Sequence, residues 1–295
     1  MNEYSAFVPN VKFELIPIKN LVSNQEYQRN LSTNHIKKTA ENFDLYQINP
    51  VKVSRRDGIN YVFNGQHTIE IIASVSGSRE TPVWCMVYED MSYTIEADVF
   101  AQQQKFVKTL SPYEIFMANI EAGNDDQLTI KSIVESYGLG ITGTKLPGSI
   151  CAIGALEDIY FKFGFHILDR TLRLCVATWE GEDNSLSANM LKGVAQIVAA
   201  FNDELRDDIF KEKIGEMSAK EIIRIAKERG GGSFGYAEAM LTAYNKKMRT
   251  GLSWVKLHEL KKVPRNSYKE RFLEQIESQQ MSMEEAQIEV QNAEE

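Results

Sequence analysis

Asn64-Gly65-Gln66-His67-Thr68 is the stretch that decides the expected fold, because it joins two segments of different character. The run before it, 59–63 (Ile-Asn-Tyr-Val-Phe), is β-branched and aromatic, which predicts a strand. The run after it, 69–75 (Ile-Glu-Ile-Ile-Ala-Ser-Val), carries apolar residues at helical spacing. A glycine at such a junction lets the backbone approach a ligand, and the first N–H groups of the helix carry a partial positive charge. The pattern therefore predicts an anion site at this turn.

The segments around this turn alternate between strand and helix signals. Pro17 cannot donate to a strand ladder, so the first segment is expected to be an edge strand. Asp57-Gly58 predicts a tight hairpin, and Ser32 or Thr33 is expected to cap the first helix. The expected strands lie at 11–18, 50–54, 59–63 and 82–89, and the expected helices at 34–45 and 66–76. A small mixed α/β domain follows from this order.

The expected domain organisation has three parts. Residues 8–100 form the α/β domain, 101–250 a helical domain, and 251–295 a basic segment followed by an acidic tail. Strand signals stop beyond residue 100, and apolar residues then recur at helical spacing. The helices expected there lie near 112–121, 125–137, 149–162, 166–179, 186–201, 218–229 and 235–249.

The first two of these helices surround Gly123 and fit a helix-turn-helix. The recognition positions would be Gln127, Lys131 and Ser132, which make a poor basic surface. Simple packing of the two helices is therefore the alternative to DNA readout.

Composition limits the class of protein. The chain has 295 residues with 25% charged and 10% aromatic side chains, which is typical of a globular protein with one or two cores. It contains no apolar run long enough for a membrane span and no recognisable secretion signal, so we expect a cytoplasmic protein. Cys85, Cys151 and Cys175 are widely spaced within apolar runs, and buried reduced thiols are expected.

The net charge and the local distribution of charge give different indications about nucleic-acid binding. A net charge of −8 argues against a protein whose whole surface binds nucleic acid. Residues 244–271 are nevertheless basic and partly aromatic, which is typical of segments that follow a phosphate backbone. Residues 272–295 contain seven glutamates and neither lysine nor arginine. Two interpretations stay open: a solvated basic helix with a polar tail, or a DNA contact that the tail screens.

The order of these motifs resembles the N-terminal domain of the ParB/sulfiredoxin superfamily, as far as Leu139. The motifs that carry the resemblance are Tyr27-Gln28-Arg29, Asn49-Pro50-Val51-Lys52-Val53, the 64–68 turn, Ala101-Gln102-Gln103-Gln104-Lys105 and Leu110-Ser111-Pro112-Tyr113-Glu114. The chain is most similar to phage and mobile-element members with a Gly-Gln-His box. The resemblance implies an α+β fold in which a small mixed-sheet domain precedes an all-α helical domain.

The resemblance also implies a nucleoside triphosphate pocket for ATP or CTP with Mg²⁺, without a dedicated set of metal ligands. The residues that it implies for nucleotide binding are Arg29, Gly65, Gln66, His67, Thr68 and Gln103. Arg29 would act as a charge clamp, because a guanidinium matches a phosphate in a bidentate way. Sulfiredoxin chemistry needs a cysteine where this chain has Gln66, so a sulfinic acid reductase is excluded.

Glu41 and His67 are the candidate catalytic residues. The resemblance implies that Glu41 positions Mg²⁺ or activates a nucleophile. Histidine titrates near neutrality, so binding through protonated His67 is expected to weaken as the pH rises.

Three classes of function stay open. The first is a nucleotide-binding switch or slow nucleoside triphosphate hydrolase that acts with DNA through residues 244–271, which would require a homodimer. The second is a nuclease, which needs clustered carboxylates that the turn does not provide. The third is a non-catalytic interaction protein of a phage or mobile element, or a small-molecule kinase that uses the same pocket.

Overall fold

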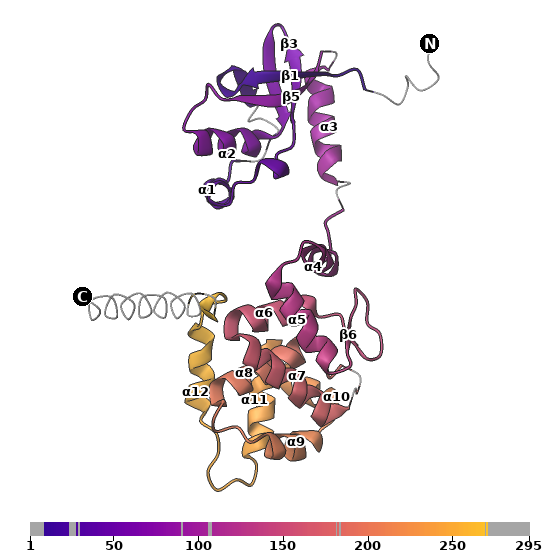
Figure 1. The fold of residues 1–295 in the computed structure, drawn as a ribbon, viewed down its shortest axis with the longest axis vertical. Coiled ribbons are helices and arrows are strands. Elements are labelled where there is room, and N and C mark those ends of the chain that lie inside the picture. The colour runs from indigo at the N-terminus through magenta and orange to yellow at the C-terminus, as the bar shows by residue number, and fades with distance from the viewer. Residues whose placement is uncertain are drawn as a thin grey trace, which may run out of the picture. The chain divides into compact units, whose positions relative to one another are not determined.

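The chain forms two compact units, Met1–Thr109 and Leu110–Glu295 (Figure 1). The computed structural model describes residues 9–23, 28, 30–89, 91–105, 108–180, 182, 184–268 and 270. The expected acidic tail and Arg29 lie outside the described residues. Helix α3 (Tyr93–Lys105) crosses the expected boundary at residue 100 and belongs to the first unit.

The first unit contains a five-stranded mixed sheet in the order β1-β5-β3-β4-β2. Its strands are β1 (Lys12–Pro17), β2 (Leu21–Ser23), β3 (Val51–Arg56), β4 (Ile59–Asn64) and β5 (Pro82–Tyr88). The pairs β1/β5 and β3/β4 are antiparallel, whereas β3/β5 and β2/β4 are parallel. Strand β1 ends in Pro17 at the sheet edge, as predicted, and β2 is an additional strand of three residues. The sheet and the helical unit that follows it confirm the α+β class.

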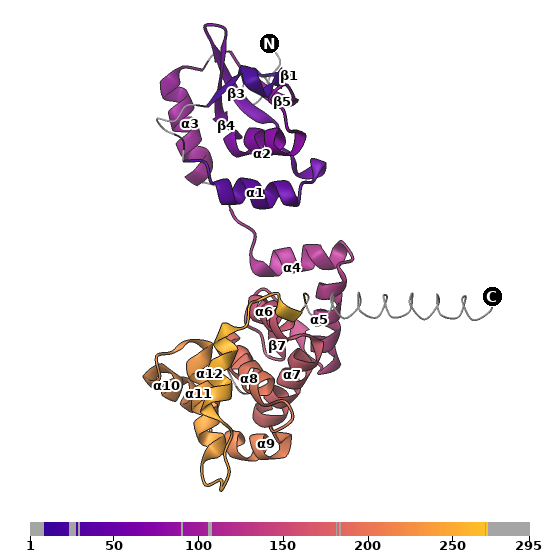
Figure 2. The same ribbon diagram turned by 90° about the vertical axis from the view of Figure 1, so that its left-hand side faces the viewer.

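Helices α1 (Thr33–Glu41) and α2 (Gln66–Ser76) lie on one side of the sheet. Figures 1 and 2 show α2 between the sheet and α1. Ile69 of α2 packs into a core of strand residues that includes Val51 and Val62. Helix α1 has no buried residues and begins at the cap residue Ser32, whose Oγ accepts from the His35 amide. It therefore packs on α2 with a largely exposed surface.

Helix α3 packs on strand residues that alternate with the core positions of β3 and β4. Arg56 forms an ion pair of 2.7 Å with the buried Glu96, and its guanidinium lies 4.4 Å from the centre of the Tyr61 ring. These contacts hold the first turn of α3 near the hairpin end of β3 and β4, whereas Gln103, near the end of α3, contacts Asn64, the residue before Gly65.

The second unit is a helical assembly around one large apolar core. Its helices are α4 (Pro112–Glu121), α5 (Asp125–Ser136), α6 (Ile153–Phe163), α7 (Phe165–Trp179), α8 (Ala188–Phe201), α9 (Asp207–Gly215), α10 (Ala219–Glu228), α11 (Gly232–Asn245) and α12 (Trp254–Glu259). Helix α9 has no predicted counterpart, and α12 lies in the basic segment for which a solvated helix was one interpretation. The short pair β6 (Gly140–Ile141) and β7 (Ser149–Ile150) corrects the expectation that strands stop at residue 100. None of the helices in the described part of the chain has the length and apolar character that a bilayer crossing requires.

The structure favours packing over DNA readout for the α4/α5 pair, and it corrects the expectation for one cysteine. Gln127 is buried and its Nε2 donates to Glu157 Oε1 at 3.0 Å, so it is not an exposed recognition residue. The pair α4/α5 therefore packs into the unit through a position that DNA readout would need. Cys151 is exposed, whereas Cys85 and Cys175 are buried, and all three thiols are free.

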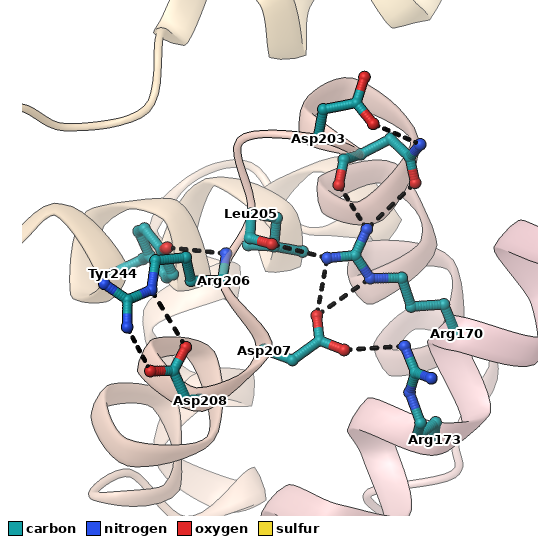
Figure 3. A network of polar contacts seen from close by, with 9 residues as sticks. Arg170, Arg173, Asp203, Leu205, Arg206, Asp207, Asp208 and Tyr244 are labelled. Carbon is teal, nitrogen blue, oxygen red and sulfur yellow. Dashed lines mark hydrogen bonds and ion pairs between the residues drawn. The ribbon is translucent and has the colours of Figure 1, made fainter.

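A polar network fixes the turn between α8 and α9 to α7 (Figure 3). The guanidinium of Arg170 on α7 donates to the carbonyl oxygens of Asn202 and Leu205 and to Asp207 Oδ1. Arg173, one turn further along α7, contacts the other oxygen of Asp207 at 2.9 Å. The network satisfies backbone carbonyls where α8 ends, which is a structural role.

Candidate functional site

Gly65 sits at the start of α2 in a conformation that favours glycine. Its φ of 106° and ψ of 14° are left-handed, and a Cβ atom there would lie 3.3 Å from Val51 Cα. No side chain caps α2, and its first intrahelical bond runs from the Ile69 amide to the Gly65 carbonyl at 3.1 Å. The amides of the three residues between them precede that bond, so they are directed out of the helix end.

A cavity of about 130 Å³ opens at this helix start. Its walls are formed by Gln28, Asn64, Gly65, Gln66, His67, Thr68 and Phe100. Four of these residues, 65–68, belong to the sequence-predicted site, and the structure brings them together around one space. Within the described part of the chain, no side chain fills the predicted turn.

His67 connects α2 to α1. Its Nε2 accepts a hydrogen bond of 3.2 Å from the Ser32 amide, and its ring lies 5.5 Å from the His35 ring in an edge-on arrangement. The imidazole is thus engaged with the start of α1, and the expected phosphate contact through His67 stays a prediction.

The far wall of the cavity comes from β4 and α3. Asn64 Nδ2 donates to Gln103 Oε1 on α3 at 2.8 Å, so Gln103 supports a wall residue and is not itself part of the wall. Phe100, one turn earlier on α3, lines the cavity directly. Sequence reasoning missed Phe100, because an aromatic side chain in a helix reads as core packing.

Gln28 is a second residue of the wall that sequence reasoning did not assign. It is 7% exposed, and its Nε2 donates to the Val62 carbonyl on β4. Its Oε1 is buried and accepts no hydrogen bond from any described residue. A buried amide oxygen of this kind requires a donor, which a water or a ligand hydroxyl can supply. The available signal was its place beside Arg29 in the Gln-Arg motif.

The other predicted residues lie elsewhere or are not described. Glu41 is exposed in the last turn of α1, roughly 13 Å along the helix axis from Ser32, at 1.5 Å per residue. The structure does not bring it to the cavity, and its catalytic role stays a prediction. Arg29 falls outside the described residues. Within the described ranges, no group of three or more His, Cys, Asp or Glu residues is placed to hold a metal ion.

The electrostatics of the cavity rest on the backbone. None of its seven wall residues is a lysine or an arginine. A helix start contributes roughly half an elementary charge, so it favours an anion only modestly. Such a site can orient a phosphate group, but tight binding would need a cation from outside the described wall.

The basic segment of the second unit is mostly exposed. Its exposed cations are Lys246, Lys247, Arg249, Lys256, Lys261, Lys262 and Arg265. Tyr244 is buried and its hydroxyl accepts from the Arg206 amide, so it cannot stack on a base. Trp254 is 39% exposed and is the better aromatic candidate. Lys269 and Arg271 lie outside the described residues.

Three comparisons place the chain among known proteins. The model of a family of unknown function (DUF6551) matches residues 22–257. Among curated proteins the chain has no match. Two crystal structures of the C-terminally truncated chromosome-partitioning protein ParB from Caulobacter crescentus are similar to it in part. The ParB structure complexed with CTP-gamma-S has a TM-score of 0.32 at 12% identity and covers 80% of this chain and 98% of that one. The ParB structure complexed to the centromeric parS site has a TM-score of 0.26 at 14% identity and covers 70% and 95%. These scores are too low to establish a common fold.

Proposed function

The chain belongs to the family of unknown function DUF6551, and on the geometry of its first unit we propose that it binds the phosphate groups of a nucleoside triphosphate at the start of α2. The observation that carries the proposal is the open cavity at Gly65, where the outward amides of α2 and the half-buried Thr68 hydroxyl meet. Helix starts with a glycine turn are frequent anion sites. The motif resemblance of residues 27–114 supports a nucleotide as the source of that anion.

The size of the cavity limits which part of the nucleotide it takes. A volume of about 130 Å³ is below the roughly 300–1,000 Å³ of common ligand pockets. It has room for about four water molecules at roughly 30 Å³ each, which is the scale of one or two phosphate groups. The base and the ribose would therefore lie outside the cavity, and selectivity among ATP, CTP and GTP would be weak unless residues beyond this wall contact the base.

DNA is the second partner in this proposal. Seven exposed cations between Lys246 and Arg265 support it, although Lys256 is paired with Glu204 and Arg265 with Asp158. Nucleotide hydrolysis, a homodimer and catalytic roles for Glu41 and His67 stay predictions. The alternative is an interaction protein or small-molecule kinase that uses the cavity without DNA.

The nucleotide proposal is tested by titrating the full chain with ATP, CTP and GTP plus Mg²⁺ in a calorimeter. Gln28→Glu places a negative charge in the wall of the cavity. It should weaken nucleotide binding by roughly tenfold, since two like charges about 4 Å apart near a protein surface repel by more than about 1 kcal/mol. Gln102→Glu, an exposed change on α3 outside the wall, is the matched control and should bind like the wild type. If Gln28→Glu does not fold, Thr68→Val removes one hydroxyl and should still reduce the affinity.

Two results would reject the proposal: no heat of binding with any nucleotide at millimolar concentration, or an unchanged affinity in Gln28→Glu and Thr68→Val. The DNA part has a separate test in a gel-shift assay at roughly 50 mM and 200 mM salt, because phosphate contacts weaken steeply with salt. Retardation only at the lower salt supports the DNA partner. Its absence at both concentrations favours the interaction protein or kinase.

A further inference from the structure

A second cavity, within the helical unit, has a different chemical character. It measures about 290 Å³ and lies against α6, α8 and the start of α11. Its polar wall consists of Asp158, Lys162, Lys192, Gln196, Ser233 and Arg265. This basic cavity takes no part in the site at Gly65, and neither the family match nor the motif resemblance assigns it a role.

The described wall contains three cations and one carboxylate, and two of the cations contact that carboxylate. Asp158 Oδ2 lies 2.5 Å from Lys192 Nζ, and its Oδ1 lies 3.0 Å from Arg265 Nε. The polar contact of Lys162 Nζ is with the Leu260 carbonyl at 3.4 Å, which is long for a hydrogen bond. The wall therefore carries a surplus of two positive charges around one space.

Burial of Lys162 makes its positive charge costly. Desolvation lowers the pKa of Lys162, with a smaller opposing effect of Asp158, which means that its ammonium group has lost water without gaining a full counter-charge. An anion in the cavity would supply that charge.

Gln196 gives a second polar feature. Its Nε2 donates to Ser233 Oγ at 3.0 Å, which fixes the amide so that Oε1 is on the other side. That oxygen is buried and accepts no hydrogen bond from any residue in the described part of the chain. Its partner must be a donor, and a phosphate in its fully ionised form has no proton to donate. A hydroxyl on the ligand would satisfy it.

Arg265 belongs to a segment that is held against α6 by the two residues Ser267 and Tyr268. Ser267, two residues later, is 8% exposed and its Oγ donates to the Lys162 carbonyl at 3.0 Å. The Tyr268 ring lies 6.1 Å from the Tyr160 ring on α6. Because these contacts hold the segment on α6, the guanidinium is placed beside Asp158 by the fold.

We propose that the basic cavity binds a small phosphate monoester that carries a hydroxyl group, as sugar phosphates do. Lys162, Lys192 and Arg265 contact the doubly charged phosphate, and Gln196 Oε1 accepts from the hydroxyl. A guanidinium and two ammonium groups match phosphate oxygens. The volume is near the lower end of the roughly 300–1,000 Å³ of common pockets, which suits a ligand of this size.

The test is calorimetric titration of the full chain with ribose 5-phosphate. Inorganic phosphate probes the anion alone, and dimethyl phosphate, a singly charged diester, stands for a nucleic-acid backbone. The expected order of affinity is ribose 5-phosphate, then inorganic phosphate, then dimethyl phosphate. Tightest binding of the diester would overturn the proposal in favour of a nucleic-acid contact, and the absence of any binding at millimolar concentration would overturn it outright.

Variants assign the binding to this cavity. Lys162→Gln and Lys192→Gln should each weaken ribose 5-phosphate binding by roughly tenfold, the scale of one charge-assisted hydrogen bond, while Lys211→Gln on the exposed face of α9 should not. Asp158→Asn removes the internal competitor and should tighten binding. That gain is opposite in sign to the loss that a merely structural role would produce, and weaker binding in a folded Asp158→Asn protein would overturn the proposal.

One further variant distinguishes binding in the basic cavity from binding at Gly65. Gln28→Glu should bind ribose 5-phosphate like the wild type, because Gln28 lines the other cavity. If Gln28→Glu loses the sugar phosphate and Lys192→Gln keeps it, the ligand occupies the first unit and the inference fails. Loss of nucleotide binding alone would leave this inference standing.

Discussion

His67 Nε2 accepts a hydrogen bond of 3.2 Å from the amide of Ser32, the residue that caps α1. Helix α1 has no buried residues, and this contact is one of those that hold the helix start against α2. We expect His67→Ala to increase hydrogen exchange across 33–41 severalfold, since local opening follows local contacts. Exchange measured by mass spectrometry checks this, with the exposed Lys37→Ala on the same helix as the control. Equal exchange in both variants would show that His67 does not anchor α1.

The left-handed Gly65 predicts a stability effect with two components. Alanine there must adopt a φ of 106° and place its Cβ 3.3 Å from Val51 Cα, whereas Gly77 at φ 68° has open space. Conformation alone should cost about 1 kcal/mol in Gly77→Ala, and crowding should raise the cost in Gly65→Ala to about 2 kcal/mol or more. The free energy of unfolding in urea measures both. An equal decrease in the free energy of unfolding in the two variants would mean that Val51 moves away from the added Cβ atom without destabilising the fold.

The parts of the fold that sequence predicted are those with local causes. Helix α2 runs from Gln66 to Ser76 as expected, because Gly65 and Gly77 define its two ends. The Asp57-Gly58 hairpin also follows local rules, since both residues have positive φ. The helix predicted near 112–121 is a third example, because Ser111 and Glu114 form a capping box that defines the start of α4.

The parts that sequence did not predict depend on distant partners. The sequence left open whether Gln127 is exposed for DNA readout or packed, and a partner 30 residues away on α6 makes its burial favourable. Phe100 and Gln28 enter the cavity wall because α3 and the segment before α1 both lie against β4. The periodicity of the sequence does not reveal such contacts between distant segments. The turn at Gly65 could therefore be predicted from the sequence, but the other residues of the cavity wall could not.

The three cysteines should differ in reactivity. Burial raises the pKa of Cys85 to about 11 and raises that of Cys175 further, whereas Cys151 is exposed. We expect a thiol reagent at pH 8 to label Cys151 alone in the native chain and all three cysteines in urea, because the thiolate is the reactive form. Labelling of Cys85 in the native chain at a rate near that of Cys151 would contradict its burial.

Cys85 also predicts a pH effect on stability. Its folded pKa lies above the unfolded reference of 9.0, so above that pH the unfolded chain releases a proton that the folded chain keeps. The contribution is constant below pH 9 and is lost between pH 9 and about 11. Cys85→Ala should therefore show a shallower alkaline decline in the free energy of unfolding than the wild type. Parallel declines would exclude Cys85 as the cause.

Arg170 should be the most sensitive position of the network in Figure 3. Its side chain donates to two backbone carbonyls and to Asp207, and lysine cannot reproduce that planar arrangement of donors. Of the two carbonyls, that of Leu205 is partly buried and that of Asn202 is exposed. Because a carbonyl left without a donor away from water costs about 1–3 kcal/mol, we expect Arg170→Lys to lower the free energy of unfolding of the second unit by about 1–2 kcal/mol, mainly through Leu205. Arg173→Lys changes a side chain that is 52% exposed and has one partner, so its effect should stay below about 0.5 kcal/mol. In a Trp84→Phe background, the remaining tryptophans Trp179 and Trp254 both belong to the second unit, so fluorescence during urea unfolding follows this unit. Similar losses in the two variants would mean that the carbonyl contacts add nothing beyond the shared ion pair.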